Sequence, residues 1–319
     1  MIDVIKSCVN QFSNNLQFNY VNPNDISQLH QYFPSAHIIF GEPLTFIPFI
    51  NQSFTTNLKW FQSTYAGVDA IVKKSKNNNY IVTRAPVFGQ HMSEYCLGHI
   101  ISHERHFPLL REAQLNKQWL TCSYRLLSSL RVGIMGASGE IGQSLARTCK
   151  HFGMYVKGLA NSQQNTNEFV DKWYQSIPTT ATFGIPREFL INLDYLISTL
   201  PSTSQTKNML SGDVLSVCNG SNTVFINIGR GDIIDEQSLV NALNNNYITH
   251  AILDVFIDEP LPVTSRLYDL GTHKIQITPH ISASSSVASY DIAQIFIRNL
   301  KRYINGESLL FVVDWKKGY

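Results

Sequence analysis

The feature that most constrains the fold is a glycine-rich turn between a short apolar run and an amphipathic segment. The run LRVGIMG spans residues 130–136, and IGQSLARTCKHFG spans 141–153. A β-rich run, a tight turn and helical periodicity that closes at a glycine predict a strand–loop–helix unit. Glycines in such a loop let the backbone approach a pyrophosphate, whose charge is met by free N–H groups and the positive end of the helix. The alternative is a plain turn that binds nothing.

The loop reads G-x-x-G-x-x-G, one residue longer than the usual G-x-G-x-x-G spacing. Its flanking strand and helix favour the dinucleotide interpretation over the plain turn. We therefore expect cofactor contacts from Gly136, Ser138, Gly139, Glu140 and Ile141.

Short apolar runs recur along the chain and alternate with helical or loop segments. They are HIIF (37–40), LKWFQST (58–64), YIVTRAP (80–86), MYVKGLA (154–160), LDYLISTL (193–200), NTVFINIG (222–229), THAILDVF (249–256) and KIQITPH (274–280). Such alternation predicts an α/β protein with doubly wound parallel sheets. A length of 319 residues favours two domains or one large doubly wound unit.

Residues 92–119 have apolar side chains near every third or fourth position, which predicts one long helix that connects two domains. The tail from Ser286 returns to a helical pattern, so it could cross back to the first domain. We therefore expect a discontinuous domain of residues 1–98 and 287–319, and a dinucleotide-binding domain of residues 99–286.

Composition excludes several classes of protein. Charged residues make up 15% and the formal net charge is +2, so no electrostatic argument favours nucleic acid or an anionic membrane. The five cysteines are scattered without Cys-x-x-Cys spacing, and His103 and His106 have no third ligand, so we expect neither disulfides nor a metal. The chain starts without a signal-like apolar segment and has no run of 18 apolar residues. We expect a cytoplasmic protein with a small-molecule partner.

Four segments, in order, resemble the D-isomer-specific 2-hydroxyacid dehydrogenase family. They are QSTYAGVDAI (62–71), VGIMGASGEIGQ (132–143), the stretch from Asn227 through IGRGDIIDE and on to LDVFIDEPLP (253–262), and TPHIS (278–282). The extra loop residue in the second segment departs from the family pattern. The tail, NLKRYINGESLLFVVDWKKGY, resembles glyoxylate/hydroxypyruvate reductase-like members.

The resemblance implies two Rossmann-like or flavodoxin-like domains, with the cofactor domain inserted into the substrate domain. It implies an active site in the interdomain cleft and a homodimer. The implied activity is reduction of a small 2-keto acid to the D-2-hydroxy acid with NAD(P)H.

By the same resemblance, Arg230, Glu259 and His280 carry the catalysis. Arg230 binds the substrate, because a planar guanidinium meets carboxylate and carbonyl oxygens together and stays charged. His280 is the general acid, since histidine titrates nearest neutral pH. Glu259 holds the proton on His280, and it is preferred to its neighbour Asp258 because it directly precedes Pro260.

Further contacts follow from the resemblance. Ala66 and Gly67 bind the substrate carboxylate through their backbone N–H groups, because small residues let the main chain approach closely. Tyr65 beside them either lines the pocket or belongs to the core. Asp254 accepts a hydrogen bond from the nicotinamide carboxamide, or it only caps local backbone. The remaining predicted cofactor contacts are Asn161, Ser162, Leu200, Pro201, Ser202, Ile228, Gly229, His280 and Ser282.

The second strand of the dinucleotide unit ends at Ala160, Asn161 and Ser162. An acidic residue there would bind the ribose hydroxyls of NAD and repel the 2′-phosphate of NADP. The chain has neither an acid nor an arginine at this point, so the sequence favours NADP only slightly over NAD.

Three other functions are distinguished by residues of this sequence. A short-chain dehydrogenase needs Tyr-x-x-x-Lys, and no tyrosine here has lysine four residues later. Formate dehydrogenase-like members have glutamine where Glu259 stands. A catalytically silent dinucleotide-sensing scaffold or corepressor on the same fold remains the alternative, although all three catalytic residue types are present.

Overall fold

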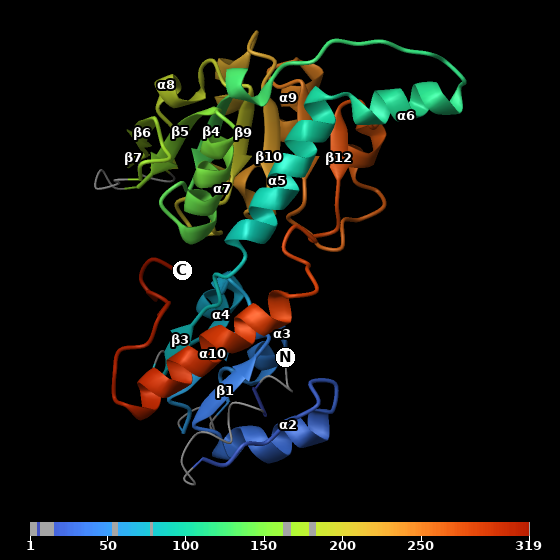
Figure 1. Cartoon of the computed structure of the whole chain (residues 1–319). Coiled ribbons are helices and arrows are strands. Elements are labelled where there is room, and N and C mark those ends of the chain that lie inside the picture. Colours follow the sequence, from blue (N-terminus) through green and yellow to red (C-terminus); the bar gives the residue numbers. More distant parts are fainter. Residues whose placement is uncertain are drawn as a thin grey trace. The chain divides into compact units, whose positions relative to one another are not determined.

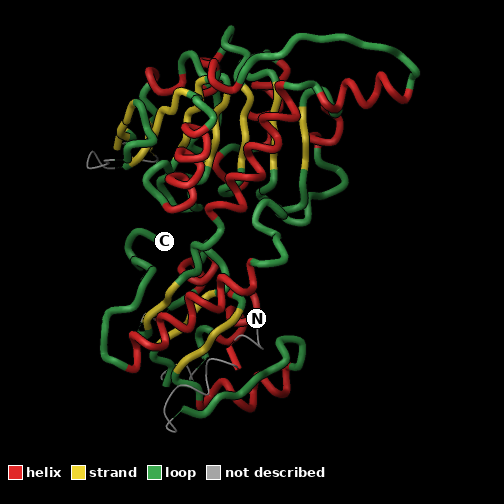
Figure 2. Tube along the Cα trace, viewed as in Figure 1, coloured by secondary structure: helices red, strands yellow, loops and turns green. Residues whose placement is uncertain are grey.

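The computed structural model describes residues 5–6, 16–52, 57–76, 79–161, 167–178 and 183–318. The chain forms two compact units, residues 1–87 with 285–319 and residues 88–284. The boundary expected at 98/99 falls inside a helix, whereas the units change over at Val87 and Phe88. Figure 1 shows the elements of each unit, and Figure 2 shows the strands in yellow with helices around them.

The larger unit is built around a seven-stranded sheet in which every pairing is parallel. Its strands are β4 (Arg131–Met135), β5 (Tyr155–Ala160), β6 (Lys172–Gln175), β9 (Tyr195–Ser198), β10 (Val224–Asn227), β11 (His250–Leu253) and β12 (Ile275–Ile277). A short antiparallel pair, β7 (Ile177–Pro178) and β8 (Phe183–Gly184), lies beside it. Neither β6 nor this pair was predicted from the sequence, because their runs are short and only partly apolar.

The helices of this unit are α5 (Gly89–Glu104), α6 (Phe107–Leu115), α7 (Glu140–His151), α8 (Arg187–Leu190) and α9 (Glu236–Asn244). Short 3-10 turns are η4 (Leu127–Ser129), η5 (Val214–Cys218), η6 (Gly231–Ile233) and η7 (Arg266–Leu270). Helices α5 and α7 lie against each other on one face of the sheet (Figure 1). Leu190 (α8), Leu215 (η5) and Leu239 (α9) belong to the apolar core of the larger unit.

The strands stand in the order β12-β11-β10-β9-β4-β5-β6. From β4 the sheet grows toward one edge through β5 and β6 and toward the other edge from β9 onward, so the order of the strands reverses between β4 and β9 although all of them are parallel. In doubly wound sheets a ligand binds at this switch point, outside the carboxyl ends of the strands. The glycine-rich turn follows β4 directly, so the fold brings it to that point.

The prediction of one long helix over residues 92–119 is wrong. The structure has two helices, α5 and α6, separated at Arg105 and His106, and His106 adopts a left-handed φ of 54°. Pro108 explains the break, because proline inside a helix removes one hydrogen bond and clashes with the preceding turn, yet it is tolerated in the first turn.

The smaller unit contains a parallel three-stranded sheet of β1 (Ile38–Gly41), β2 (Trp60–Ser63) and β3 (Ile81–Thr83) in that order. Its helices are α2 (Ile26–Tyr32), α3 (Pro43–Phe46), α4 (Asp69–Lys74) and α10 (Ala288–Ile304), with 3-10 turns η1 (Phe33–Ser35) and η2 (Ile47–Phe49).

The C-terminal segment belongs to the smaller unit. Asn299 of α10 donates from Nδ2 to Gln62 Oε1 on β2 (3.0 Å), and the ring of Phe296 stacks on Trp60 with centroids 5.5 Å apart. Val312 then forms a bridge to Thr83 at the edge of the sheet. These contacts join the two ends of the sequence in one core.

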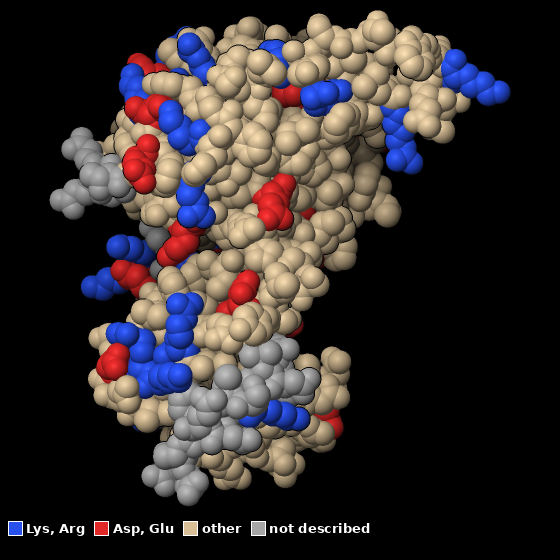
Figure 3. Space-filling model, in the orientation of Figure 1, with Lys and Arg blue, Asp and Glu red and all other residues tan. Residues whose placement is uncertain are grey.

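The surface drawn in Figure 3 carries basic and acidic side chains interspersed among uncharged ones. Among the described residues, no helix is long and apolar enough to cross a membrane. In the same part of the chain, no group of three or more His, Cys, Asp or Glu could hold a metal ion.

Candidate active site

The glycine-rich turn contains three glycines, and the structure requires glycine at two of these positions. Gly136 has a φ of +84°, and a Cβ there would lie 2.7 Å from Thr199 Oγ1. A Cβ on Gly142 would lie 2.2 Å from the carbonyl oxygen of Gly136, so the start of α7 packs on the turn only without a side chain.

Gly139 is different, because a Cβ there meets nothing closer than 3.5 Å and its φ of −76° suits any residue. The fold itself therefore does not require glycine at this exposed position, which caps α7 with no side-chain hydrogen bond. A missing side chain and a helix N-terminus without a side-chain cap fit the close approach of a pyrophosphate. The residues present therefore fit a dinucleotide.

Predicted cofactor contacts follow the neighbouring strands. Asn161 is exposed after β5, while Ser162 lies outside the described residues. In the loop after β9, Ser202 donates to Asp232 Oδ2 (2.6 Å), and this bond links that loop to the one after β10. Ile228 is buried and donates its backbone N–H to Ser198 O (3.1 Å).

Arg230 stands between two glycines that the packing requires. A Cβ on Gly229 would lie 2.6 Å from the carbonyl oxygen of Leu200, and one on Gly231 would lie 2.0 Å from the carbonyl carbon of Phe256. The loop after β10 is thus pressed between the loops after β9 and β11. The half-buried Arg230 donates from Nη1 to Gly229 O (2.7 Å), and Asn227 Nδ2 donates to Arg230 O (3.0 Å).

Glu259 and His280 are in direct contact. His280 Nδ1 lies 2.7 Å from Glu259 Oε2, and Glu259 Oε1 accepts the backbone N–H of Phe256 at 2.9 Å. Because Phe256 also packs on Gly231, one short path of contacts joins the loops of Arg230, Glu259 and His280. These loops follow β10, β11 and β12, which are neighbours in the sheet. The structure gives Asp258 no such contact with His280.

Asp254 is fully buried at the end of β11, and its carboxylate is occupied by its own chain. Oδ1 accepts from Thr278 Oγ1 (2.6 Å) and from the backbone N–H of Ile281 (2.8 Å), and Oδ2 accepts from the N–H of Ser282 (2.8 Å). The two backbone groups lie 27 and 28 residues further along the chain, so these contacts do not cap local backbone, and the carboxamide contact stays a prediction. Ser282 Oγ is buried and has no hydrogen-bond partner among the described residues.

Tyr65, Ala66 and Gly67 follow β2 in the smaller unit. The backbone N–H of Tyr65 donates to Ser63 Oγ (2.9 Å), and its carbonyl accepts from Ala85 N–H (3.0 Å). Burial, followed by the charge of Glu42, raises the pKa of the Tyr65 hydroxyl, although its side chain is 41% exposed. The substrate contacts expected of these residues stay a prediction.

Residues 97–282 match the family model described as the D-isomer specific 2-hydroxyacid dehydrogenase, NAD binding domain. This match spans more than half of the chain. The chain belongs to the D-isomer-specific 2-hydroxyacid dehydrogenase family. It is accordingly an NAD(P)-dependent enzyme, and its larger unit contains the NAD-binding domain of the family.

Known relatives agree with this assignment. The chain is 30% identical over 264 residues to glyoxylate/hydroxypyruvate reductase A of Photorhabdus laumondii, covering 80% of this chain and 79% of the relative. A crystal structure of a family member from Aeromonas salmonicida superposes with a TM-score of 0.84 at 34% identity, covering 98% of this chain and 96% of that one. An NADPH-dependent glyoxylate/hydroxypyruvate reductase from Sinorhizobium meliloti, solved with NADP and sulfate, gives 0.80 at 25% identity, covering 100% and 97%.

Three contacts of this family member were not predicted from its sequence. They are the backbone N–H of Phe256 on Glu259, the hydroxyl of Thr278 on Asp254, and Tyr95 of α5, whose hydroxyl lies 2.6 Å from Thr278 Oγ1. Thr278 lay within the quoted motif TPHIS, so its position next to His280 was a usable signal. Nothing in the sequence could pair Tyr95 with a residue 183 positions away.

Proposed function

We propose that this dehydrogenase reduces a small 2-keto acid, such as glyoxylate or hydroxypyruvate, to the D-2-hydroxy acid. The observation that carries the proposal is the 2.7 Å contact between His280 Nδ1 and Glu259 Oε2. The loop of Glu259 follows β11, the strand next to the one whose loop carries Arg230. The relatives named as glyoxylate/hydroxypyruvate reductases support the same substrate class.

Reduction of a 2-keto acid requires a hydride at the carbonyl carbon, a proton at the carbonyl oxygen and a cation near the carboxylate. The nicotinamide cofactor supplies the hydride when it is bound. Arg230 binds the carboxylate and the carbonyl oxygen, because its planar guanidinium can donate two parallel hydrogen bonds and keeps its charge at any working pH.

His280 delivers the proton. Because Glu259 takes the Nδ1 side of the ring, Nε2 is the nitrogen that gives its proton to the carbonyl oxygen as the new C–H bond forms. Afterwards the neutral imidazole takes a new proton from water, which can reach the ring because His280 is 45% exposed.

We also propose a modest preference for NADPH over NADH. Ala160 is buried and Asn161 is exposed at the end of β5, and neither side chain repels a 2′-phosphate. The two cofactors are compared by kcat/KM under one set of conditions. A preference for NADH of about tenfold, which is about 1.4 kcal/mol, would reject this part of the proposal.

The partner we propose is a second copy of the chain, bound through helix α6 and the segment that follows it. Leu115 is 76% exposed, Trp119 97% and Leu126 65%. In Figure 3 the surface over α6 is uncharged apart from the basic side chains near its end. Large exposed apolar side chains grouped in one segment are typical of protein–protein interfaces.

The decisive experiment is a turnover panel with glyoxylate, hydroxypyruvate and bulkier 2-keto acids, each with NADPH and NADH. We expect the highest kcat/KM for one of the small acids and a D-configured product where the product is chiral. A dinucleotide-sensing scaffold would bind the cofactor and turn over none of these acids, so binding without turnover would favour that alternative.

A further inference from the structure

A chain of hydrogen bonds runs from helix α5 to the backbone beside His280. Tyr95 Oη lies 2.6 Å from Thr278 Oγ1, which lies 2.6 Å from Asp254 Oδ1. An ionised carboxylate only accepts hydrogen bonds, so Thr278 donates its single proton to Asp254. Tyr95 must then donate to Thr278, and this fixes the direction of the whole chain.

At its far end the chain holds the residues that follow His280. The buried carboxylate of Asp254 accepts the backbone N–H groups of Ile281 and Ser282, both at 2.8 Å. His280 itself has a left-handed φ of 53°, a conformation that costs energy for a residue with a side chain and persists only when its surroundings impose it. The Asp254 contacts are placed to impose it.

We infer that Tyr95 is a positioning residue for His280, acting through Thr278 and Asp254. Glu259 orients the imidazole ring, and the Tyr95 chain orients the backbone from which that ring projects. Tyr95 comes from a helix of sixteen residues, so the loop gains an anchor from outside the β11 and β12 segments. The inference rests on the proposed role of His280 as proton donor, because proton transfer depends steeply on distance and orientation.

Tyr95 remains a donor throughout the working pH range. Burial raises the pKa of its hydroxyl far above the ordinary value, outweighing the opposite effect of the Thr278 hydrogen bond. The charges and titratable groups that face it are Asp254, Cys96 of its own helix and the ring of His99, whose centroid lies 4.3 Å away. Burial also raises the pKa of Cys96 and lowers that of His99, so both are neutral near pH 7.

The test compares Tyr95→Phe, Thr278→Val and Thr278→Ser with a control, Gln276→Leu. Gln276 Oε1 makes a 3.1 Å hydrogen bond with His99 Nδ1, so the control breaks another link between α5 and β12 that does not lead to His280. Thr278→Ser keeps the hydroxyl and should retain activity. We expect kcat to fall about three- to tenfold in Tyr95→Phe and at least as much in Thr278→Val, with KM for the keto acid unchanged.

A second readout does not depend on turnover. Amide hydrogen exchange of Ile281 and Ser282 should become faster in Tyr95→Phe and Thr278→Val, and remain at the parental rate in Thr278→Ser and in the control. Parental exchange and parental kcat in Tyr95→Phe would overturn the inference. So would an equal loss of kcat in the control, because that would indicate a general loosening of α5.

The two proposals can fail separately. If the parental protein reduces no keto acid, the proposed function fails while amide exchange still tests the positioning of the loop. If the parent is active and Tyr95→Phe changes neither readout, only the positioning inference fails.

Discussion

The pairing of Glu259 with His280 is a property of single side chains, and pH tests it directly. Reduction needs protonated His280, so kcat/KM should fall toward alkaline pH. Glu259→Gln keeps the shape and an acceptor but removes the charge 2.7 Å from Nδ1. We expect the alkaline limb of kcat/KM to move to lower pH, and oxidation of the hydroxy acid to improve relatively at low pH.

Asp258→Asn is the matched control, since it removes the neighbouring charge in the same loop. Both pH profiles should stay in place in this variant. A shift produced by Asp258→Asn alone, or a parental alkaline limb in Glu259→Gln, would contradict the pairing.

Arg230 permits a second test at this scale. Arg230→Lys preserves the charge but replaces a planar fork by a point-like ammonium, which cannot reproduce two parallel hydrogen bonds to an oxo acid. Steady-state kinetics should show a loss in kcat/KM of about ten- to a hundredfold. Efficiency near that of the parent would remove Arg230 from substrate binding.

In the turn between β4 and α7, the packing of the fold requires glycine at position 142 but not at position 139. We therefore expect substitutions at these two glycines to affect stability and cofactor binding differently. Gly139→Ala adds a Cβ that the fold tolerates. The close approach of a pyrophosphate to this turn, which we propose, depends on the absence of that Cβ. We expect the free energy of unfolding, measured by thermal denaturation, to stay within about 0.5 kcal/mol of the parent. The affinity for NADPH, measured by fluorescence titration, should fall about tenfold. Gly142→Ala should instead cost roughly 1–3 kcal/mol of stability, because its Cβ overlaps Gly136 O. Unchanged cofactor affinity in Gly139→Ala would argue against a pyrophosphate at this turn.

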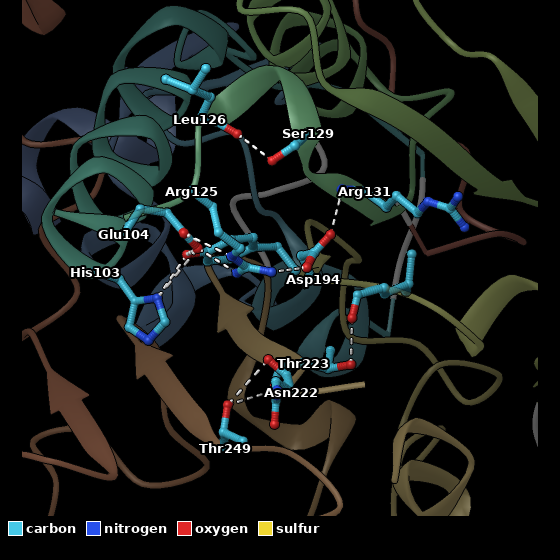
Figure 4. Close-up of polar contacts among 12 residues, drawn as sticks. His103, Glu104, Arg125, Leu126, Ser129, Arg131, Asp194, Asn222, Thr223 and Thr249 are labelled. Carbon is cyan, nitrogen blue, oxygen red and sulfur yellow. Dashed lines mark hydrogen bonds and ion pairs between the residues drawn. The ribbon is translucent and has the colours of Figure 1, made fainter. Parts of the chain in front are cut away.

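The buried carboxylate of Glu104, the last residue of helix α5, is held in a cluster of polar contacts (Figure 4). It links α5 to Tyr195, the first residue of strand β9. Glu104, 4% exposed, accepts from Arg125 Nη2 (2.6 Å) and from Tyr195 Oη (2.7 Å), and Arg125 also pairs with Asp194. Burial opposes ionisation, but hydrogen bonds from His103, Arg125 and Tyr195 lower the pKa of Glu104 from 4.5 to about 2. This cluster attaches the segment after α6 to the core of the larger unit.

A depressed carboxyl pKa adds stability above the ordinary pKa, and this stability is lost as pH falls through the folded value. The contribution of Glu104 should therefore be complete above about pH 5 and disappear between 4.5 and about 2. At pH 7 the free energy of unfolding of Glu104→Gln, measured by denaturant titration, should be roughly 2–3 kcal/mol lower than that of the parent. Near pH 3 the difference in this free energy should be smaller. An equal difference at both pH values would contradict this account.

For the whole molecule, the segment from α6 to Leu126 decides the oligomeric state that we propose. Trp119→Asp puts a charge at its most exposed apolar side chain. If a second copy covers this segment, light scattering should show a dimer for the parent and mainly a monomer for the variant, with far-UV circular dichroism unchanged. Tyr20→Asp changes an exposed aromatic in the smaller unit and should leave the parental mass. A monomeric parent would reject the dimer.

The sequence alone determined the parallel α/β class and most of the strands, because buried parallel strands are short, continuous apolar runs that local pattern reveals. It also located the turn at Gly136, and the family resemblance selected Glu259 and His280, which the structure brings into contact. Local pattern misled over residues 92–119, where apolar spacing continued across Pro108 although the helix could not.

The contacts between groups far apart in the sequence follow from the packing of the folded chain. Gly229 and Gly231 are small because the loops of Leu200 and Phe256 press against them, and Asp254 holds backbone that lies 27 and 28 residues further on. Tyr95 reaches Thr278 because α5 packs beside β12. Such pairings depend on how strands are ordered in the sheet and on which face each helix covers. A single sequence does not encode these contacts locally, since their free energy arises only when distant segments are packed together.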